Sequence, residues 1–148
     1  MIKKYTTKSF LETQKLGENL VLVIARTPPR RGTKQSKTAV VLALQGNLGG
    51  GKTTFLQGFA KGLNIQDKIL SPTFVIMKRF GNFYHFDCYR INKPEEILEL
   101  GFAEIISDPK NIVAIEWPEK IKKYLPKNTI KIDFKFIDEN TREILMVI

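Results

Sequence analysis

The segment GNLGGGKTTF, residues 46–55, constrains the fold of this chain more than any other part of the sequence. It follows the apolar run AVVLALQ, which is typical of a strand buried on both faces of a parallel sheet, and it leads into KTTFLQGFAKGLN, which has helical spacing of apolar residues. The glycines allow the backbone to point successive N–H groups into one concavity, and a helix N-terminus adds further free N–H groups. Gly-x-x-x-x-Gly-Lys-Thr between strand and helix therefore predicts a phosphate-binding P-loop.

The parts of this loop have separate expected roles. Lys52 reaches the β- and γ-phosphates of a nucleotide, and the hydroxyl of Thr53 ligates Mg²⁺. ATP and Mg²⁺ are the expected cofactors, although the loop alone leaves the kind of nucleotide open. The rest of the expected phosphate cradle is Gly46, Asn47, Leu48, Gly49, Gly50, Gly51 and Thr54.

A P-loop also needs an acid for its Mg²⁺, usually at the end of a neighbouring buried strand. Two acids are candidates, Glu116 at the end of the apolar run IVAIE and Asp87 at the end of FYHFD. Glu116 is the preferred metal ligand because it follows a fully apolar strand, and Asp87 is expected to orient the attacking water or a metal-bound water, although which of the two dominates Mg²⁺ binding stays open. Thr73 lies on the connection after the P-loop helix, where a P-loop protein often carries a switch hydroxyl near the γ-phosphate, and a plain turn is the alternative. His85 alternates with Asp87 on one strand face, but a lone histidine is more often structural, so we assign it no site role.

Composition indicates one globular domain, residues 1–148. Apolar residues make up 43% and charged residues 26%, which is typical of a soluble protein. A single cysteine excludes an internal disulfide, and with a single histidine it also excludes a zinc site built from these residues, so a reducing compartment is expected. No apolar run is long enough to span a membrane, and the start lacks the apolar core of a signal peptide, so we expect a cytoplasmic protein with no membrane partner.

The net charge of +9 is concentrated in two segments. Residues 26–37 hold five basic residues and no acid, and residues 119–131 hold five lysines against one acid. Such charge attracts nucleic acid, acidic proteins and nucleotide phosphates alike. No aromatic residue interleaves with the charges of 26–37, so this basic loop is not expected to stack on bases, and a plain solvated loop remains an equal alternative.

The remaining pattern predicts a mixed sheet with flanking helices. A short strand at 2–5 precedes a helix that Ser9 caps, with Glu12 at the capping-box spacing. Gly81-Asn82 predicts a hairpin turn, and alternating residues from 130 to 148 around the turn DENT predict a C-terminal antiparallel hairpin. Further helices are expected after Pro94, ending at Gly101, and after Pro118, and the first helix is expected to bury Leu16, Leu20, Val23 and Ile24. The fold class is therefore an α/β, P-loop NTPase-like single domain.

Two other nucleotide-binding classes share parts of this pattern. A GTP switch commonly carries Asn-Lys-x-Asp, and residues 92–95 are Asn-Lys-Pro-Glu, in which the proline begins a helix, so guanine specificity is unsupported. A small-molecule or nucleoside kinase needs an arginine-rich lid, which Arg26, Arg30 and Arg31 could imitate, but these precede the P-loop whereas a kinase lid usually comes late. The kinase stays as the alternative, together with a basic nucleic-acid-binding module that holds nucleotide as a structural ligand.

The order of motifs resembles one known family. GNLGGGKTT, then SPTF, then YHFDCYR, a glutamate-rich helix ending in glycine, and IEWPE look like the TsaE (YjeE) family of bacterial P-loop ATPases, and the resemblance runs over almost the whole chain. It implies an ATPase acting with TsaB- and TsaD-like proteins in making N6-threonylcarbamoyladenosine at position 37 of tRNAs that read codons starting with A. The tRNA would be contacted indirectly or at the edge of the complex.

The resemblance also implies site residues. It places Thr53 and Glu116 on Mg²⁺, Thr73 and Asp87 in switch-like segments, and Lys52 on phosphate. Four further residues are implied near the nucleotide, which are Phe10 and Thr13 over the adenine side, Trp117, and Arg142 of the C-terminal strand. The chain departs from the family in its longer, more basic loop at 26–37 and in Cys88, where leucine is common.

Overall fold

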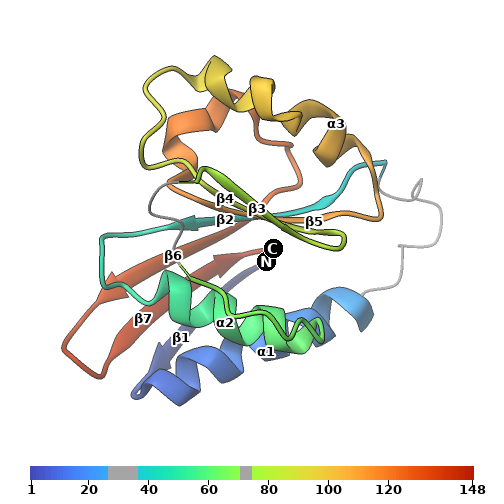
Figure 1. The fold of residues 1–148 in the computed structure, drawn as a ribbon. Helices are drawn as coiled ribbons and strands as arrows, with labels where there is room; N and C mark the ends of the chain where they lie inside the picture. Colours follow the sequence, from blue (N-terminus) through green and yellow to red (C-terminus); the bar gives the residue numbers. More distant parts are fainter. Residues whose placement is uncertain (27–36, 71–74) are drawn as a thin grey trace.

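A mixed sheet forms the centre of the protein (Figure 1), seen in a computed structural model that describes residues 1–26, 37–70 and 75–148. Within these residues the sheet has seven strands in the order β1-β7-β6-β2-β5-β4-β3. Neighbours among β6, β2, β5 and β4 run parallel, while β1, β7 and β3 pair antiparallel with their neighbours. The strands are β1 Ile2–Thr7, β2 Val40–Gln45, β3 Met77–Phe80, β4 Phe83–Asp87, β5 Ile112–Glu116, β6 Ile130–Phe136 and β7 Arg142–Val147.

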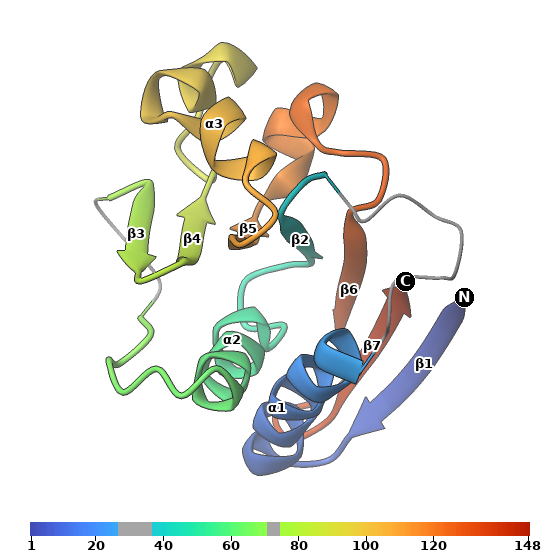
Figure 2. The same cartoon turned by 90° about the vertical axis from the view of Figure 1, so that its right-hand side faces the viewer.

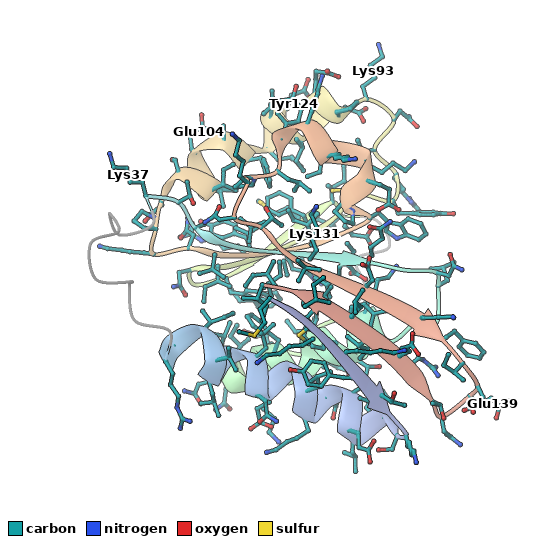
Figure 3. The ribbon with its side chains drawn as sticks, turned by 180° about the vertical axis from the view of Figure 1, so that it is seen from behind. Lys37, Lys93, Glu104, Tyr124, Lys131 and Glu139 are labelled. Atoms are coloured by element: carbon teal, nitrogen blue, oxygen red, sulfur yellow. The ribbon has the colours of Figure 1, made fainter. Side chains whose placement is uncertain are left out.

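Helices cover the sheet on both faces (Figures 1 and 2). Helices α1 (Phe10–Arg26) and α2 (Lys52–Gly62) pack on one face, and α3 (Phe102–Ser107) lies on the other with two 3₁₀ helices, η1 (Pro94–Leu100) and η2 (Pro118–Tyr124). Figure 3 shows Lys93, Glu104 and Tyr124 in this second layer and Glu139 at the tip of the β6–β7 turn. The predicted fold class, with its mixed sheet, flanking helices and C-terminal hairpin, is confirmed.

Strand β2 is buried because its side chains pack into two hydrophobic cores, one on each face of the sheet. Leu42 and Leu44 pack with the α1 and α2 side chains, whereas Val41 packs with those of α3, η1 and η2. Alternate residues of a strand point to opposite faces, so a strand covered on both sides must be apolar throughout. The strand thereby holds the P-loop, which follows it, between the two layers.

Glycines allow α1 and α2 to pack backbone to backbone. A Cβ atom added at Gly17 would lie 2.1 Å from the carbonyl oxygen of Phe55, and one added at Gly58 would lie 1.8 Å from that of Gln14. No other residue fits at such distances without moving a helix. This contact fixes the N-terminal end of α1 beside the N-terminal end of α2.

The start of α1 carries the predicted cap in modified form. Ser9 Oγ accepts a hydrogen bond from the backbone N–H of Glu12 at 3.1 Å, as expected. The Glu12 carboxylate accepts from the N–H of Lys8 at 2.6 Å instead of from Ser9 itself. At the other helix, α2 ends at Gly62, and Asn64 follows with φ 60, a left-handed conformation that is typical of a helix end.

Several details differ from the prediction. Val23, expected on the buried side of α1, is 41% exposed. The helix packs closely on α2 at Gly17, and its buried residues form a narrow stripe of Thr13, Gly17 and Leu20 that leaves Val23 outside. Among the alternating residues of β6, Ile132 and Phe134 are buried as the pattern predicts, whereas Phe136, the last residue of the strand, is 51% exposed. The segment after Pro94 is a 3₁₀ helix ended by Gly101 at φ 78, and α3 follows it without having been predicted.

Three further findings concern predicted regions. The basic loop, apart from Arg26 and Lys37, lies outside the described residues. None of the helices in the described part of the chain has both the length and the apolar character that a membrane crossing requires. The strand FYHFD pairs not only with β3, as the predicted hairpin requires, but also with β5 in parallel, so it lies inside the sheet.

Candidate active site

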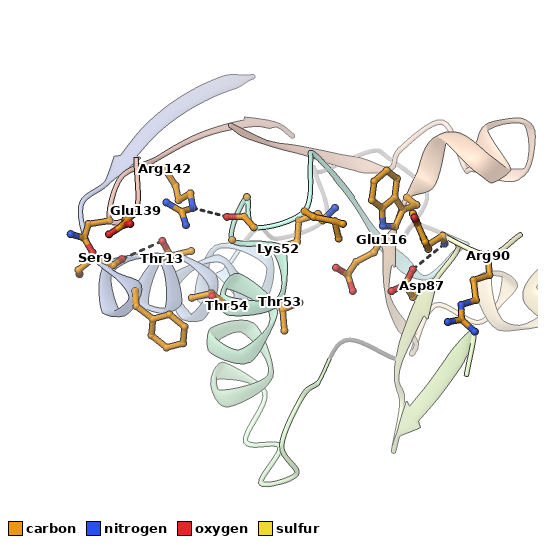
Figure 4. Close-up of a pocket in the computed structure, with 18 of the residues that line it drawn as sticks. Ser9, Thr13, Lys52, Thr53, Thr54, Asp87, Arg90, Glu116, Glu139 and Arg142 are labelled. Carbon is orange, nitrogen blue, oxygen red and sulfur yellow. Dashed lines mark hydrogen bonds between the residues drawn. The ribbon is translucent and has the colours of Figure 1, made fainter. Parts of the chain in front are cut away.

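A cavity of about 570 Å³ opens at the carboxyl ends of β2, β4 and β5 (Figure 4). The N-terminal ends of α1 and α2 and the β6–β7 turn close its other sides. Ligands of open α/β sheets bind outside the carboxyl ends of the strands, and small-molecule sites commonly have volumes of roughly 300–1,000 Å³. Its lining residues are Ser9, Phe10, Thr13, Leu48, Gly49, Gly50, Gly51, Lys52, Thr53, Thr54, Val75, Ile76, Asp87, Tyr89, Arg90, Glu116, Trp117, Glu139, Asn140 and Arg142.

The glycine loop has the backbone that a phosphate cradle requires. Gly46, Gly49 and Gly51 have φ of 141°, 78° and 99°, which side-chain-bearing residues rarely adopt. A Cβ atom at Gly46 would lie 2.4 Å from the carbonyl oxygen of Phe134, so there is also no room for a side chain at this position. Gly51 is the N-cap of α2 and makes no side-chain cap, which leaves the first N–H groups of the helix directed toward the cavity.

Lys52 is held in place by contacts with the protein itself. Its side chain is largely buried, its Nζ donates to the carbonyl oxygen of Gly46 at 2.5 Å, and it lies 4.3 Å from the ring centre of Trp117. Burial lowers the pKa of Lys52 below its usual 10.5, while the negative charges of Glu116, Glu119 and Asp87 act in the opposite direction. A cation with little access to water is a strong attractor for phosphate oxygens.

Two carboxylates meet at neighbouring strand ends. Asp87 on β4 and Glu116 on β5 are register partners, and both are buried, at 9% and 3% exposure. The Oδ1 atom of Asp87 accepts from the N–H of Tyr89 at 3.0 Å, and Oε2 of Glu116 lies 2.7 Å from Nε2 of His85. In Figure 4 Glu116 lies between Lys52 and Asp87.

The donor set at this end of the cavity fits Mg²⁺. Hydroxyl and carboxylate oxygens are the ligands that this ion prefers, and Thr53, Asp87 and Glu116 all line the cavity. Few other protein oxygens are needed, because Mg²⁺ keeps several waters and binds substrate phosphates. Thr53 and Glu116 would hold the ion, as the sequence predicts, and Asp87 is close enough in register to join them.

Trp117 follows Glu116 in an unusual conformation. Its φ and ψ are 57° and 51°, the left-handed region, which is costly for a bulky residue. The turn aims the indole at the cavity, where it packs with Tyr89 at a ring-centre distance of 5.1 Å and with the Lys52 ammonium. Strain of this kind clusters at functional sites, where the surroundings hold it in place.

The far wall joins α1 to the β6–β7 turn. Phe10 is 59% exposed at this wall, and Thr13 is buried, its hydroxyl 2.7 Å from that of Thr7. Arg142 donates from Nε to the carbonyl oxygen of Gly49 at 3.0 Å, which ties β7 to the glycine loop. The Arg142 guanidinium also lies over the ring of Phe136, at 4.6 Å.

Most residues predicted for the site therefore line one cavity. Gly46 and Asn47 do not line it. The carbonyl oxygen of Gly46 instead accepts the hydrogen bond from Lys52 Nζ. Thr73 lies outside the described residues. The residues that sequence reasoning missed are Ser9, Val75, Ile76, Tyr89, Arg90, Glu139 and Asn140. For Tyr89 and Arg90 the signal was present in YHFDCYR, whereas Glu139 and Asn140 approach the loop only through the strand order.

The fold and the site define an α/β protein of the P-loop class, with a glycine loop, a buried lysine and two acids at strand ends. Comparison with known proteins gives the family. The family model described as threonylcarbamoyl adenosine biosynthesis protein TsaE matches residues 7–144, and the chain belongs to this family. The resemblance inferred from the sequence is thereby confirmed.

Relatives and a solved structure agree with this assignment. Proteins named tRNA threonylcarbamoyladenosine biosynthesis protein TsaE match from Nostoc sp., with 35% identity over 93% of this chain and 83% of the relative, and from Bacillus subtilis, with 38% identity over 74% and 70%. The protein of that name from Rickettsia typhi is 41% identical over 69% of this chain and 73% of its own length. The crystal structure of Bacillus subtilis YdiB superposes with a TM-score of 0.75 and 28% identity, covering 99% of this chain and 84% of that one.

Proposed function

We propose that this protein is the Mg²⁺-dependent ATPase subunit of the machinery that forms N6-threonylcarbamoyladenosine at position 37 of tRNAs reading codons that start with A. It acts there with TsaB- and TsaD-like partner proteins, and tRNA is contacted indirectly or at the edge of the complex. One observation carries the proposal. In a chain of the TsaE family, the glycine loop, Lys52 and the paired acids Asp87 and Glu116 converge on one cavity.

The residues of the cavity divide the work of ATP hydrolysis. The N–H groups of the loop and of the α2 N-terminus bind phosphate, and the Lys52 ammonium neutralises charge that develops on the phosphates. Thr53 and Glu116 hold Mg²⁺, which supplies further neutralising charge on phosphate oxygens when it is bound. Asp87, oriented by the N–H of Tyr89, positions the attacking water.

The wall built from α1 and β7 takes the nucleoside. Phe10 offers an exposed apolar ring against which a base can pack, and Thr13 lies one turn further along the same helix. Arg142, fixed to Gly49, supports the loop from the side of this wall. The cavity thus offers one wall for the base and the glycine loop for the triphosphate of ATP. We expect the protein to work in the cytoplasm, where ATP and tRNA are available.

The alternative of a small-molecule or nucleoside kinase receives no support from the described residues. Arg26, one of the three arginines considered for a lid, ends α1, whereas the cavity meets this helix at Phe10 and Thr13. The rise of 1.5 Å per residue puts Arg26 roughly 20 Å from Thr13 along the helix. Arg30 and Arg31 lie outside the described residues.

Depletion of the protein tests the proposal in cells. Loss of N6-threonylcarbamoyladenosine from digested tRNA, measured by mass spectrometry and restored by the wild-type gene but not by K52A, is the expected result. Co-purification from an extract should bring TsaB- and TsaD-like proteins with the chain. Unchanged tRNA modification after depletion would contradict the proposed role, and transfer of phosphate from ATP to an added acceptor in preference to water would favour the kinase.

A further inference from the structure

His85 contacts the acid of the cavity from a buried position behind it. The residue lies on β4, two positions before Asp87, and its side chain is fully buried. Its Nε2 lies 2.7 Å from Oε2 of Glu116 on the neighbouring strand β5. Because Asp87 is the register partner of Glu116, His85 reaches that carboxylate diagonally, from the protein interior rather than from the cavity side.

The hydrogen bonding of this histidine is one-sided. Among the described residues, Nδ1 of His85 has no hydrogen-bond partner. A histidine kept for packing or for internal hydrogen bonding normally satisfies both ring nitrogens when buried. A carboxylate that ligates a cation can only accept a hydrogen bond, so with Glu116 in that role the Nε2 atom of His85 is the donor. The imidazole is therefore hydrogen-bonded to Glu116 through Nε2, while its Nδ1 has no partner among the described residues.

The neighbourhood of Glu116 explains why a donor is needed there. Asp87 stands beside it, and two carboxylates this close repel each other. Each acid has a donor of its own, since Asp87 is held by the N–H of Tyr89 and Glu116 by the imidazole. Without the imidazole, the Glu116 side chain would be free to turn away from Asp87 and from the place where both face the cavity.

We propose that His85 is a positioning residue that fixes the carboxylate of Glu116 for the divalent cation of the nucleotide site. This inference rests on the proposed function, because it takes Glu116 as a ligand of that cation. Residues that orient metal ligands in this way commonly change metal affinity by about 10–100-fold when they are replaced. The expected defect is therefore in cation binding, with nucleotide binding in the absence of metal preserved.

A matched pair of substitutions tests the contact. The amide nitrogen of glutamine reaches the place of Nε2, whereas that of asparagine is one methylene too short, so H85Q keeps the donor and H85N loses it. Mn²⁺ is titrated into each purified protein with ADP present, and free Mn²⁺ is measured by electron paramagnetic resonance. We expect Mn²⁺ affinity to fall about tenfold or more in H85N and to stay near that of the wild type in H85Q. ADP affinity in EDTA, measured by calorimetry, should be the same in all three proteins.

Other results would overturn the inference. Wild-type Mn²⁺ affinity in H85N would show that Glu116 needs no help, and equal losses in H85N and H85Q that extend to ADP in EDTA would show a purely structural role. Crystal structures of the wild type and H85N give a second, independent readout, because an unmoved Glu116 carboxylate also overturns the inference. H85L replaces H85N in both measurements if H85N does not fold. Failure of the wild type to bind ADP and Mn²⁺ would count against the proposed function, and the position of Glu116 would still decide the role of His85.

Discussion

Asp87 and Glu116 lie directly opposite each other at the carboxyl ends of β4 and β5. The two acids come from segments 29 positions apart in the numbering, and they meet because their strands are parallel neighbours. A pair of buried carboxylates is unfavourable unless a cation or hydrogen-bond donors compensate. A divalent cation next to Lys52 would compensate both charges, and the proposed function gives the two acids separable tasks.

The first prediction separates these two acids. E116Q should weaken Mg²⁺-dependent nucleotide binding by about 10–100-fold or more. This is the range for replacing a residue that only orients a metal ligand, and replacing the ligand itself should cost at least as much. D87N should leave that binding closer to the wild type and instead slow hydrolysis, since loss of a positioned base or water-orienting group commonly costs about 10²–10⁴-fold. Mg²⁺ titrations of nucleotide binding and of phosphate release measure both effects. The opposite ranking would move the metal assignment to Asp87.

The second prediction concerns Lys52. K52A should lower ATP turnover by about 10²–10³-fold, because it removes a charge that stabilises the transition state. K61A is the matched control, since Lys61 is an exposed lysine in the last turn of the same helix. Phosphate release under saturating ATP and Mg²⁺ gives the comparison. Equal turnover in K52A and the wild type would mean that the glycine loop does not serve hydrolysis.

The third prediction concerns the helix contact beside the site. In G58A the new methyl group would lie 1.8 Å from the carbonyl oxygen of Gln14, so α1 must move away from α2. We expect a loss of about 1–3 kcal/mol in the free energy of unfolding, and weaker nucleotide binding because α1 carries Phe10 and Thr13. Urea unfolding and calorimetry measure these, with N19A, on the exposed side of α1, as the control. If the free energy of unfolding of G58A equals that of the wild type, α1 and α2 pack less closely than described.

The fourth prediction concerns pH. Burial raises the pKa of the Cys88 thiol from 9.0 to about 12, with the negative charge of Asp87 adding to the effect. The unfolded chain therefore loses this proton from about pH 9 upward while the folded protein keeps it. The stability that Cys88 contributes is fully present below pH 9 and falls toward pH 12, by up to about 1.4 kcal/mol per pH unit.

Comparison with C88A isolates this effect of pH. The difference in unfolding free energy between the wild type and C88A should shrink as pH rises from 8 to about 10, measured by urea unfolding. The thiol should also resist a thiol-reactive dye at pH 8 in the folded protein and react after unfolding, because the thiolate is the reactive form. Parallel pH profiles for the two proteins would contradict the raised pKa.

Local patterns predicted much of the fold and of the site. The glycine loop, its flanking strand and helix, and the acids at strand ends follow from residue types and spacing. The residues of one cavity wall, Phe10, Thr13 and Arg142, came only from the family resemblance. Strand order does not follow from such patterns, and it is the strand order that brings Glu139 and Arg142 to the loop. Val23 could not be placed because helical spacing does not reveal that Gly17 narrows the buried stripe.

The histidine illustrates a different limit. His85 and Glu116 are 31 residues apart, and nothing in the sequence marks them as partners. Their contact depends on β4 and β5 being parallel neighbours, whereas the Gly81-Asn82 turn suggests only that β4 pairs with β3. A side chain that acts through another one is visible only once both strands are in place.

The position of β1 has a consequence for how the protein is made. This strand is synthesised before the others described, yet it lies at the edge of the sheet and pairs with β7, in register from Ile2 with Val147 to Thr7 with Arg142. Contacts between such distant segments form slowly, because a long loop must close first. During translation β1 therefore cannot pair until β7, the last of the described strands, has been synthesised. Since α1 follows it directly and supplies Phe10 to the cavity, the ability to bind nucleotide is expected to emerge only after the last strand has left the ribosome.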